Sequence, residues 1–361
     1  MIYRAIGVMS GSSLDGLDIV FSEFQENAGK WTYEIRNAKC YLYDEQWIKK
    51  LATAKNLGAF DYHVLHTEYG HFVGSLVNRF IDQFGLHYQP ALICSHGHTV
   101  FHSPLKKMTA QLGDGAAIAA ETSLPVVCDL RSLDVAFSGQ GAPIVPIGEK
   151  LLLGDHDAFL NLGGIANISF KTEPYVAFDV CPANRVLNLL ANEVGKQFDS
   201  SGELAATGMV DDKLLAKLNN LSYYAQQHPK SLANEFGTEI VYPLVKDSDL
   251  RTSDALRTFV EHIAIQIRQA ISNSRVPSVK SILVTGGGAF NEFLVERLRQ
   301  RLADLYVNVV VPNQNLVKFK EAMIMAFIGV LRWRQEYNVL SSVTGAIRDS
   351  ISGALWIGQE A

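Results

Sequence analysis

Gly7-Val8-Met9-Ser10-Gly11-Ser12-Ser13-Leu14-Asp15-Gly16 and Asn161-Leu162-Gly163-Gly164-Ile165-Ala166-Asn167 are the two stretches that decide the fold. Each lies between apolar, β-rich runs, so each predicts a tight turn between two strands. Glycine has no Cβ, which lets backbone N–H groups of such a turn approach a phosphate closely. The chain continues into another strand and contains no GxxxxGK[ST] sequence, which argues against a P-loop. Two similar turns predict two related halves with a central cleft.

The elements around both turns follow the same order. The first half predicts strands and helices in the order βββαβαβ: 3–9, 17–25, 31–43, 62–84, 91–94, a helix from 115, and 125–128. The second half predicts βββα and then αβαβα: 157–161, 165–170, 174–178, a helix from 183, 252–273, 281–284, 290–303, 306–311 and 319–335. Two copies of βββαβαβα predict an α/β protein with duplicated domains of the actin-like ATPase type, as in sugar kinases and Hsp70.

The chain is long enough for two domains. Its 361 residues exceed what one hydrophobic core usually supports. The stretch from about 130 to 150 contains Ser138-Gly139-Gln140-Gly141-Ala142-Pro143, whose composition is typical of a crossing between domains. We therefore predict one domain over 1–138 with the C-terminal segment 336–361, and a second over 139–335.

Composition excludes several functions. The formal net charge is −5 and no block of like charges occurs, which argues against non-specific nucleic-acid binding. No apolar run has the length of a membrane span, and the first residues do not resemble a secretion signal, so we expect a cytoplasmic protein without a membrane partner. The four cysteines show no CxxC spacing and lie in or beside apolar segments, which predicts buried reduced thiols.

Two aspartates are candidates for chemistry. Asp179 follows the third predicted strand of the second half, where a carboxylate is placed to act as a general base or to cap the next helix. Asp15 follows the first glycine turn and either holds Mg²⁺ through water or serves only as an Asp-Gly turn residue.

Two further charged residues lie at element ends. Arg131 follows a buried strand, where its guanidinium either clamps a carboxylate or forms a surface ion pair with Asp129 or Asp134. Glu321 heads an apolar helix and either complements the helix dipole or bonds substrate hydroxyls.

A third glycine-rich segment follows the strand near residue 284. Gly286-Gly287-Gly288 precedes Asn291, which replaces the third glycine of a dinucleotide fingerprint and therefore weakens a Rossmann interpretation. In a duplicated actin-like protein this loop faces adenosine, with Asn291 as a cap or a nucleotide contact. A tight turn without a ligand is the alternative.

The first glycine turn belongs to a longer motif, Met9-Ser10-Gly11-Ser12-Ser13-Leu14-Asp15-Gly16-Leu17-Asp18. This motif resembles MSGTSLDGxD, the opening motif of the anhydro-N-acetylmuramic acid kinase family. Other family motifs follow in the same order along nearly the whole chain: Ser95–His102, Leu112–Gly115, Gly139–Pro143, Asn161–Ile168 and Lys320–Ala322.

The resemblance implies an ATP- and Mg²⁺-dependent enzyme of cell-wall recycling. It would open 1,6-anhydro-N-acetylmuramic acid with water and phosphorylate O6, with Asp179 as the base that activates the water. Substrate binding falls to Arg131, Glu321, His98 and Asp114. ATP binding falls to Gly11, Ser12, Ser13, Leu14, Asp15, Gly16, Leu17, Asp18, Gly163, Gly164, Gly286, Gly287, Gly288 and Asn291. The expected partners are the amino sugar and ATP, with a homodimer as an alternative to a monomer.

The sequence departs from the family near the expected site. The family's DTGPxN is Asp179-Val180-Cys181-Pro182-Ala183-Asn184, its HGQT has His98 in place of glutamine, and its PPKSTGRE is His228–Glu235 without the arginine. Two alternatives therefore stay open beside the anhydro-sugar kinase: a kinase for a different sugar on the same fold, and a non-catalytic sugar sensor or Hsp70-like ATPase.

Overall fold

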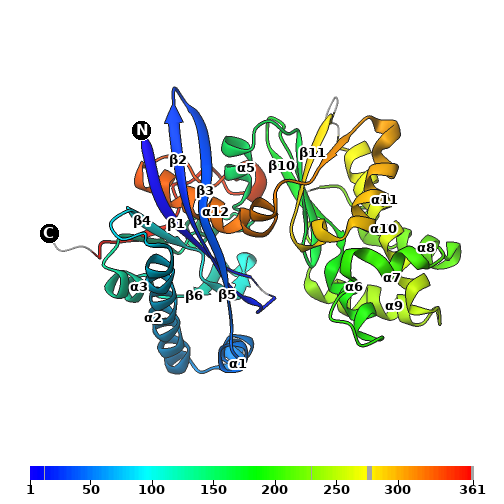
Figure 1. Cartoon of the computed structure of the whole chain (residues 1–361), viewed down its shortest axis with the longest axis horizontal. Coiled ribbons are helices and arrows are strands. Elements are labelled where there is room, and N and C mark those ends of the chain that lie inside the picture. Colours follow the sequence, from blue (N-terminus) through cyan, green and yellow to red (C-terminus); the bar gives the residue numbers. More distant parts are fainter. Residues whose placement is uncertain (12, 229, 275–278, 359–361) are drawn as a thin grey trace. The chain divides into compact units, whose positions relative to one another are not determined.

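The computed structural model describes residues 1–11, 13–228, 230–274 and 279–358. Two compact units make up the chain, Met1–Leu153 with Phe319–Ala361 as unit 1 and Gly154–Lys318 as unit 2 (Figure 1). Among the described residues no helix combines the length and the apolar character needed to cross a bilayer.

The sheet of unit 1 has the order β13-β7-β4-β1-β2-β3. Its strands are β1 (Ile2–Ser10), β2 (Gly16–Asn27), β3 (Lys30–Leu42), β4 (Leu92–Ser95), β7 (Val126–Cys128) and β13 (Ala354–Trp356). β1, β2 and β3 are antiparallel, whereas β4 runs parallel to β1 and β7 runs parallel to β4. A separate hairpin, β5 (His98–Ser103) and β6 (Met108–Leu112), follows β4.

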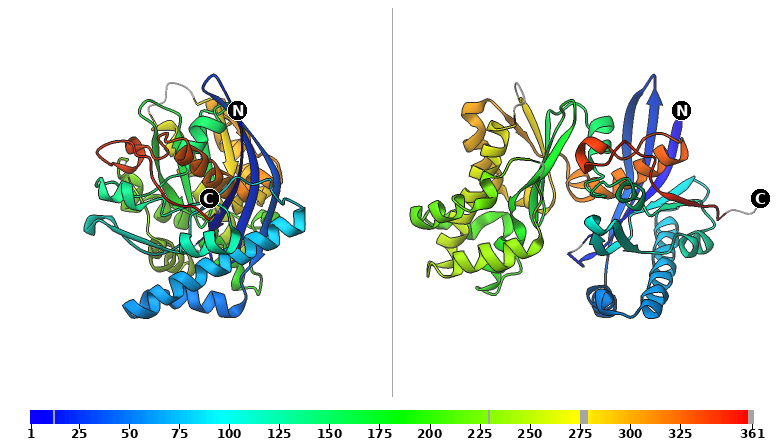
Figure 2. Two further views of the ribbon diagram at one scale, coloured as in Figure 1. Left: turned by 90° about the vertical axis from the view of Figure 1, so that its left-hand side faces the viewer. Right: turned by 180° about the vertical axis from the view of Figure 1, so that it is seen from behind.

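Helices cover both faces of this sheet. α2 (Ala59–Phe84) and α3 (Gly115–Thr122) lie on the same side of the sheet (Figure 2). Their apolar residues form one buried cluster together with those of β1 and β2. α12 (Gln314–Trp333) packs against the strands through Phe327, whose ring contacts Phe24 and Trp31. The remaining helices of unit 1 are α1 (Glu45–Thr53), α4 (Ser132–Ala136), α5 (Pro146–Leu152) and α13 (Ser341–Thr344).

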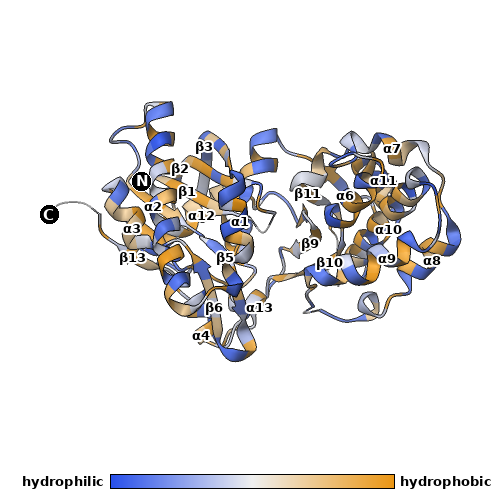
Figure 3. Cartoon of the chain, turned by 90° about the horizontal axis from the view of Figure 1, so that it is seen from below, coloured by the Kyte–Doolittle hydropathy of each residue, from blue (hydrophilic) through white to orange (hydrophobic). Residues whose placement is uncertain are grey.

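The sheet of unit 2 repeats this plan in the order β10-β9-β8-β11-β12. Its strands are β8 (Ala158–Leu162), β9 (Ile165–Phe170), β10 (Val176–Pro182), β11 (Ser281–Thr285) and β12 (Asn308–Val310). Its helices are α6 (Asn184–Asn192), α7 (Glu203–Thr207), α8 (Asp212–Asn219), α9 (Tyr242–Lys246), α10 (Thr252–Ser272) and α11 (Glu292–Leu302). The long helix α10 buries apolar residues and also Thr258, Glu261, His262 and Gln266. Hydrophobic and hydrophilic residues alternate along its ribbon in Figure 3.

Both sheets therefore share one topology. An antiparallel trio of strands is followed by two parallel strands beside the first, in the spatial order third, second, first, fourth, fifth. This repetition confirms the predicted duplicated α/β fold of the actin-like ATPase type. Unit 1 adds the β5–β6 hairpin and the edge strand β13, neither of which was predicted.

The boundaries of the two units differ from those of the predicted domains. α5 and residues 319–335 belong to unit 1, so unit 1 extends to Leu153 and resumes at Phe319. The turn-rich stretch at 138–143 is a loop inside unit 1, where Gly139 N donates to Asp134 O and Gln140 N to Thr344 O. Turn composition marks a loop but carries no information about which core the flanking helices join.

Candidate active site

The first glycine turn lies between β1 and β2 of unit 1. Ser13 Oγ donates to Asp15 Oδ1 over 2.7 Å, and Leu14 adopts a φ of 59°. Gly16 and Leu17 already belong to β2, and Leu17 is fully buried in the core. Ser12, predicted to bind ATP, lies outside the described residues. Gly11, Ser13 and Asp15 are therefore the residues of the turn that a ligand could reach, because Leu17 is packed in the core.

Asp18 follows the turn on β2 and lies among acidic neighbours. Burial raises its pKa to about 6, a side-chain hydrogen bond with Cys40 lowers it, and the negative charges of Asp15 and Glu321 raise it further. Burial also raises the pKa of Glu321, while Lys320 lowers it and Glu149 raises it. Asp15 and Glu321 are thus each near enough to Asp18 for their charges to raise its pKa, although Glu321 is far from both in sequence.

The residue before Glu321 forms a buried ion pair. Lys320 Nζ donates to Glu149 Oε1 over 2.7 Å, and both side chains are almost completely excluded from solvent. α5 and α12 supply the two partners. Sequence reasoning missed this pair, because the two residues are separated by nearly half of the chain.

Arg131 is buried rather than placed on the surface. Its Nε donates to Gly141 O over 2.6 Å, its Nη1 to Thr99 Oγ1 over 3.1 Å, and its Nη2 lies 3.3 Å from the ring nitrogens of His102. Burial lowers its pKa to about 10, and burial together with the Arg131 charge lowers that of His102 to about 4. Among the described residues Arg131 forms no ion pair.

The alternative of a surface ion pair for Arg131 is therefore wrong. Asp134 instead accepts hydrogen bonds from Gly141 N and Thr344 Oγ1, and Asp129 accepts one from Ser132 Oγ. A buried guanidinium with only neutral partners suits an anionic ligand, because a charge taken out of water is costly unless it is paired.

The two remaining predicted substrate contacts also have structural partners. Asp114 caps α3, since its Oδ1 accepts from Ala116 N over 2.9 Å, and its Oδ2 lies 3.4 Å from Thr67 Oγ1. His98 begins β5, and its Nδ1 lies 2.9 Å from Ser10 Oγ. A substrate hydroxyl bound by Asp114 would have to donate to a carboxylate lone pair that these two hydrogen bonds do not use.

Unit 2 gathers its predicted ATP-binding residues around the start of α6. Ala183 N and Asn184 N donate to Gly164 O and Gly163 O over 2.9 and 3.0 Å, and Asn184 Nδ2 donates to Leu162 O over 2.9 Å. A Cβ added to Gly287 or Gly288 would lie 3.5 or 2.9 Å from the amide of Asn184. The second glycine turn and the triple-glycine loop therefore converge on Asn184.

The glycines of these two loops fall into two classes. Gly286 has a φ of 83° and a Cβ there would lie 2.4 Å from Asn161 Oδ1, while a Cβ at Gly288 would lie 2.7 Å from Leu162 Cβ. Gly163 and Gly164 show neither constraint, because their nearest neighbours would be 3.4 and 3.6 Å away. The fold itself therefore does not demand glycine at 163 and 164, because a Cβ at either position would make only ordinary van der Waals contacts.

Asn291 caps α11, because its Oδ1 accepts from Leu294 N over 2.9 Å. The structure thus shows the capping role that the sequence left open. A nucleotide contact through its Nδ2 stays a prediction.

Asp179 lies within β10 and not at its end, which corrects the predicted strand end at 178. A register shift between Asp179 and Cys181 marks a bulge there, and β10 continues to Pro182. Asp179 pairs with Asn167 of β9, which in turn pairs with Asn161 of β8. Residues paired across strands share a face, so these three residues form a polar row on one face of the sheet.

Distant segments hold Asp179 in place. Its Oδ2 accepts from Leu232 N over 2.8 Å, its carbonyl oxygen accepts from Tyr223 Oη over 2.6 Å, and its N donates to Lys230 O over 3.3 Å. Burial raises its pKa, and the hydrogen bond from Leu232 N lowers it. Oδ1 has no hydrogen bond with any described residue, which leaves one carboxylate oxygen available to a water molecule.

The acidic residues fit magnesium only in the company of a phosphate. No group of three or more potential metal-ligating side chains occurs in the described part of the chain. Mg²⁺, however, is usually bound through one or two carboxylates together with substrate phosphates and water. Asp15, beside Asp18 and the glycine turn, meets that requirement.

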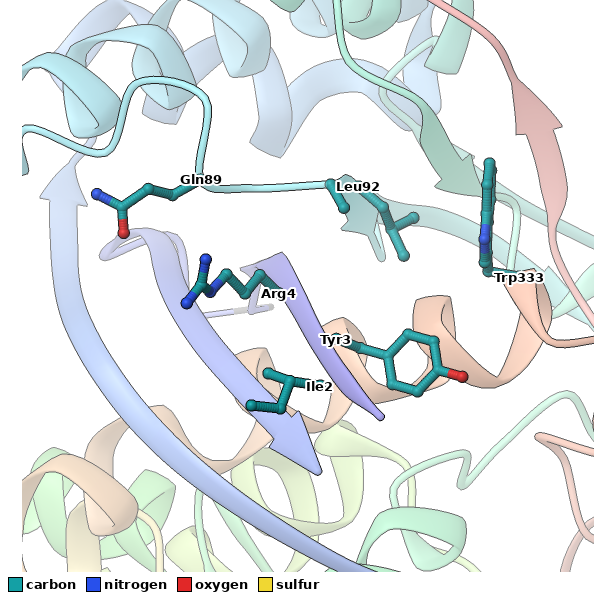
Figure 4. Close-up of a pocket in the computed structure, with 7 residues that line it drawn as sticks. Ile2, Tyr3, Arg4, Gln89, Leu92 and Trp333 are labelled. Carbon is teal, nitrogen blue, oxygen red and sulfur yellow. The ribbon is translucent and has the colours of Figure 1, made fainter. Parts of the chain in front are cut away.

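One cavity of unit 1 lies away from these residues. Its volume is about 360 Å³, and its lining comes from the start of β1, the segment before β4 and the end of α12 (Figure 4). β1 runs from this cavity to Ser10 over roughly 25 Å, since a strand rises about 3.4 Å per residue. The cavity is therefore separate from the glycine turn.

Comparison with known proteins places the chain in a family. The family model described as anhydro-N-acetylmuramic acid kinase matches residues 3–358. The anhydro-N-acetylmuramic acid kinase of Vibrio parahaemolyticus is 32% identical, with 97% of each chain covered. That of Sulfurovum sp. is also 32% identical and covers 98% of this chain and 99% of its own. A solved structure of the activator of 2-hydroxyisocaproyl-CoA dehydratase from Clostridium difficile, with bound ADPNP, aligns at a TM-score of 0.47 and 11% identity over 92% of this chain and 96% of its own. On the full-length family match and the curated relatives, the chain belongs to the anhydro-N-acetylmuramic acid kinase family.

Proposed function

We propose that this kinase opens the anhydro bridge of 1,6-anhydro-N-acetylmuramic acid with water and transfers the γ-phosphoryl group of ATP to O6. The product would be N-acetylmuramic acid 6-phosphate, formed during recycling of cell-wall peptidoglycan. The family match over 3–358 supports the activity. The observation that carries the mechanism is the partly buried carboxylate of Asp179, which is anchored through Oδ2 and has no hydrogen bond from a described residue at Oδ1.

Asp179 would act as the general base. A water hydrogen-bonded to Oδ1 gives its proton to the carboxylate as its oxygen bonds to C1, and the C1–O6 bond breaks. O6 then bonds to the γ-phosphorus of ATP and ADP leaves, so no separate acid is needed to protonate O6. The raised pKa of Asp179 makes its carboxylate a stronger base than an exposed aspartate.

The glycine turns would hold the phosphates of ATP. Backbone N–H groups near Gly11 and Gly163 are suited to this, since phosphoryl transfer depends mainly on positioning and charge stabilisation. Mg²⁺, bound through water at Asp15, would neutralise charge on the phosphates. Gly286–Gly288 and Asn291 would lie along the adenosine, and Glu321 would bond sugar hydroxyls.

Substitution of glycines that the fold requires and glycines that it does not require tests where the nucleotide binds. We expect Gly163→Ala to keep the wild-type melting temperature and to raise KM for ATP by ~10-fold or more, because its methyl group would occupy space proposed for a phosphate. Gly288→Ala is the matched control, and we expect it to lower stability by ~1–3 kcal/mol through a clash with Leu162. An unchanged KM in Gly163→Ala would remove the second turn from the ATP site.

Arg131 would bind the lactyl carboxylate of the muramic acid. Lysine keeps the charge but loses the planar fork, so we expect Arg131→Lys to raise KM for the anhydro-sugar by ~10–100-fold with a smaller change in KM for ATP. Steady-state kinetics with the anhydro-N-acetylglucosamine analogue, which lacks the lactyl group, provide the control. Wild type and variant should use that analogue equally poorly, and a variant defect of the same size with both sugars would contradict the assignment.

The activity itself is tested by sugar-dependent release of ADP. We expect 1,6-anhydro-N-acetylmuramic acid to stimulate ADP formation more than any other amino sugar in a panel. Binding of the sugar without turnover would favour the sensor alternative, and a better acceptor in the panel would favour a different sugar. The altered loop at 180–184 makes this panel worth including.

A further inference from the structure

Four buried polar side chains connect the first glycine turn to β5. Tyr69 Oη lies 2.6 Å from Tyr43 Oη, Tyr43 Oη donates to Ser10 Oγ over 2.8 Å, and Ser10 Oγ lies 2.9 Å from His98 Nδ1. Ser10, Tyr43, Tyr69 and His98 are 3, 6, 0 and 5% exposed. Ser10 is the last residue of β1 and immediately precedes the turn.

The donors and acceptors give this chain of hydroxyl groups a direction. Tyr43 uses its proton on Ser10, so Tyr69 must donate to Tyr43. Ser10 Oγ accepts from Tyr43, and its own proton is available to Nδ1 of His98 when the neutral ring carries its hydrogen on Nε2. Burial lowers the pKa of His98 and therefore favours this neutral ring. All three hydroxyl protons are then used, and the imidazole is the final acceptor of the chain.

β5 carries contacts to the proposed sugar site as well. Thr99, the residue after His98, accepts a hydrogen bond from Arg131 Nη1, and His102 lies against Arg131 Nη2. A register shift between Thr99 and Phe101 interrupts the ladder with β6 at this point. The same short strand therefore contacts the residue before the phosphate turn and the proposed carboxylate clamp.

We propose that His98 is a positioning residue for the ATP-binding turn, acting through its Nδ1 on Ser10, and that it does not bind the sugar directly. This inference rests on the proposed role of the turn in holding the phosphates of ATP. Buried side-chain networks with every member bonded restrict a segment to one conformation. Loss of the last acceptor would free the Ser10 hydroxyl and with it the start of the turn.

Two substitutions separate the ring nitrogens of His98. Asparagine places a polar atom near the Nδ1 position, whereas glutamine, the usual family residue, places one near the Nε2 position. We expect His98→Asn to keep the dissociation constant of a fluorescent ATP analogue and KM for ATP within about threefold of wild type. We expect His98→Gln to raise both by ~10-fold, with KM for the anhydro-sugar changed by less than about threefold, and both variants to melt near the wild-type temperature.

Ser10→Ala provides the second arm of the test. In that background His98→Gln should have no further effect on nucleotide affinity, because the bond it disturbs is already absent. A better nucleotide affinity in His98→Gln than in His98→Asn, equal effects of both, or a rise in KM for the sugar alone would overturn the proposal. Nucleotide affinity is measured without turnover, so failure of this inference is distinct from failure of the proposed kinase reaction, which wild-type ADP release tests separately.

Discussion

Asp179→Asn is expected to lower kcat by ~1000-fold with little change in either KM, since a positioned general base contributes ~100–10,000-fold. The amide oxygen of asparagine can still accept from Leu232 N, so the loop that anchors Asp179 should keep its hydrogen bond. Stability should not fall, because a neutral amide replaces a carboxylate whose charged form is disfavoured by burial. Steady-state measurements of ADP release give kcat, and thermal melting gives the melting temperature of each variant.

Asp212→Asn is the matched control for this substitution. Asp212 is an exposed aspartate in the same unit, at the start of α8, so kcat should stay near the wild-type value. The pH profile gives an independent check. The base works only when ionised, so kcat/KM should decline as pH falls through a pKa above the ordinary aspartate range, and Asp179→Asn should lose that decline. A variant with wild-type kcat would exclude Asp179 as the base.

Glu149→Gln is expected to destabilise the protein by ~3–5 kcal/mol, because it leaves the Lys320 ammonium buried without its counter-charge. A loss of this size corresponds to a fall in melting temperature of ~6–20 °C for a unit of this length. Lys320 also lowers the pKa of Glu321, so the buried pair links the stability of α12 to the charge of a proposed substrate ligand. Differential scanning calorimetry measures the effect.

The double variant Glu149→Gln with Lys320→Met should be more stable than Glu149→Gln alone, since it removes the unpaired charge. Glu68→Gln is the surface control. Glu68 pairs with Lys50 at the surface, where the two side chains are 46 and 41% exposed, and such pairs contribute only about 0–1 kcal/mol. If Glu149→Gln and Glu68→Gln melt at the same temperature, the buried pair is not a stabilising contact of α5 and α12.

The duplicated fold could be predicted from the sequence because its signals are local. A glycine turn between two β-rich runs opens each half, and the predicted strands at 3–9 and 17–25 correspond to β1 and β2 within two residues at each end. The β5–β6 hairpin escaped prediction because its histidine- and glycine-rich start does not show the alternation of a half-buried strand. The end of β10 was misplaced because a bulge lets the strand continue past Asp179.

The residues of the site could be named from motifs, but their chemistry depends on tertiary contacts. Asp179 is anchored by Tyr223 and Leu232, which lie 44 and 53 residues further along the chain. The raised pKa of Asp18 comes first from burial, with a smaller contribution from the charge of Glu321 at the other end of the sequence. These contacts join residues that are distant in sequence, so no local sequence pattern indicates them. The sequence therefore predicts which groups form the site but not their pKa values.

Isotope labelling in H₂¹⁸O tests the central claim most directly. The protein is incubated with ATP, Mg²⁺ and 1,6-anhydro-N-acetylmuramic acid, quenched early, and the product analysed by mass spectrometry beside unlabelled N-acetylmuramic acid 6-phosphate kept in the same water to measure exchange at C1. We predict one ¹⁸O at C1 of the 6-phosphosugar, none in the phosphoryl group, and ~1000-fold less product from Asp179→Asn in the same time. A phosphorylated sugar that retains its anhydro bridge, or label found only in inorganic phosphate, would contradict coupled ring opening and phosphorylation.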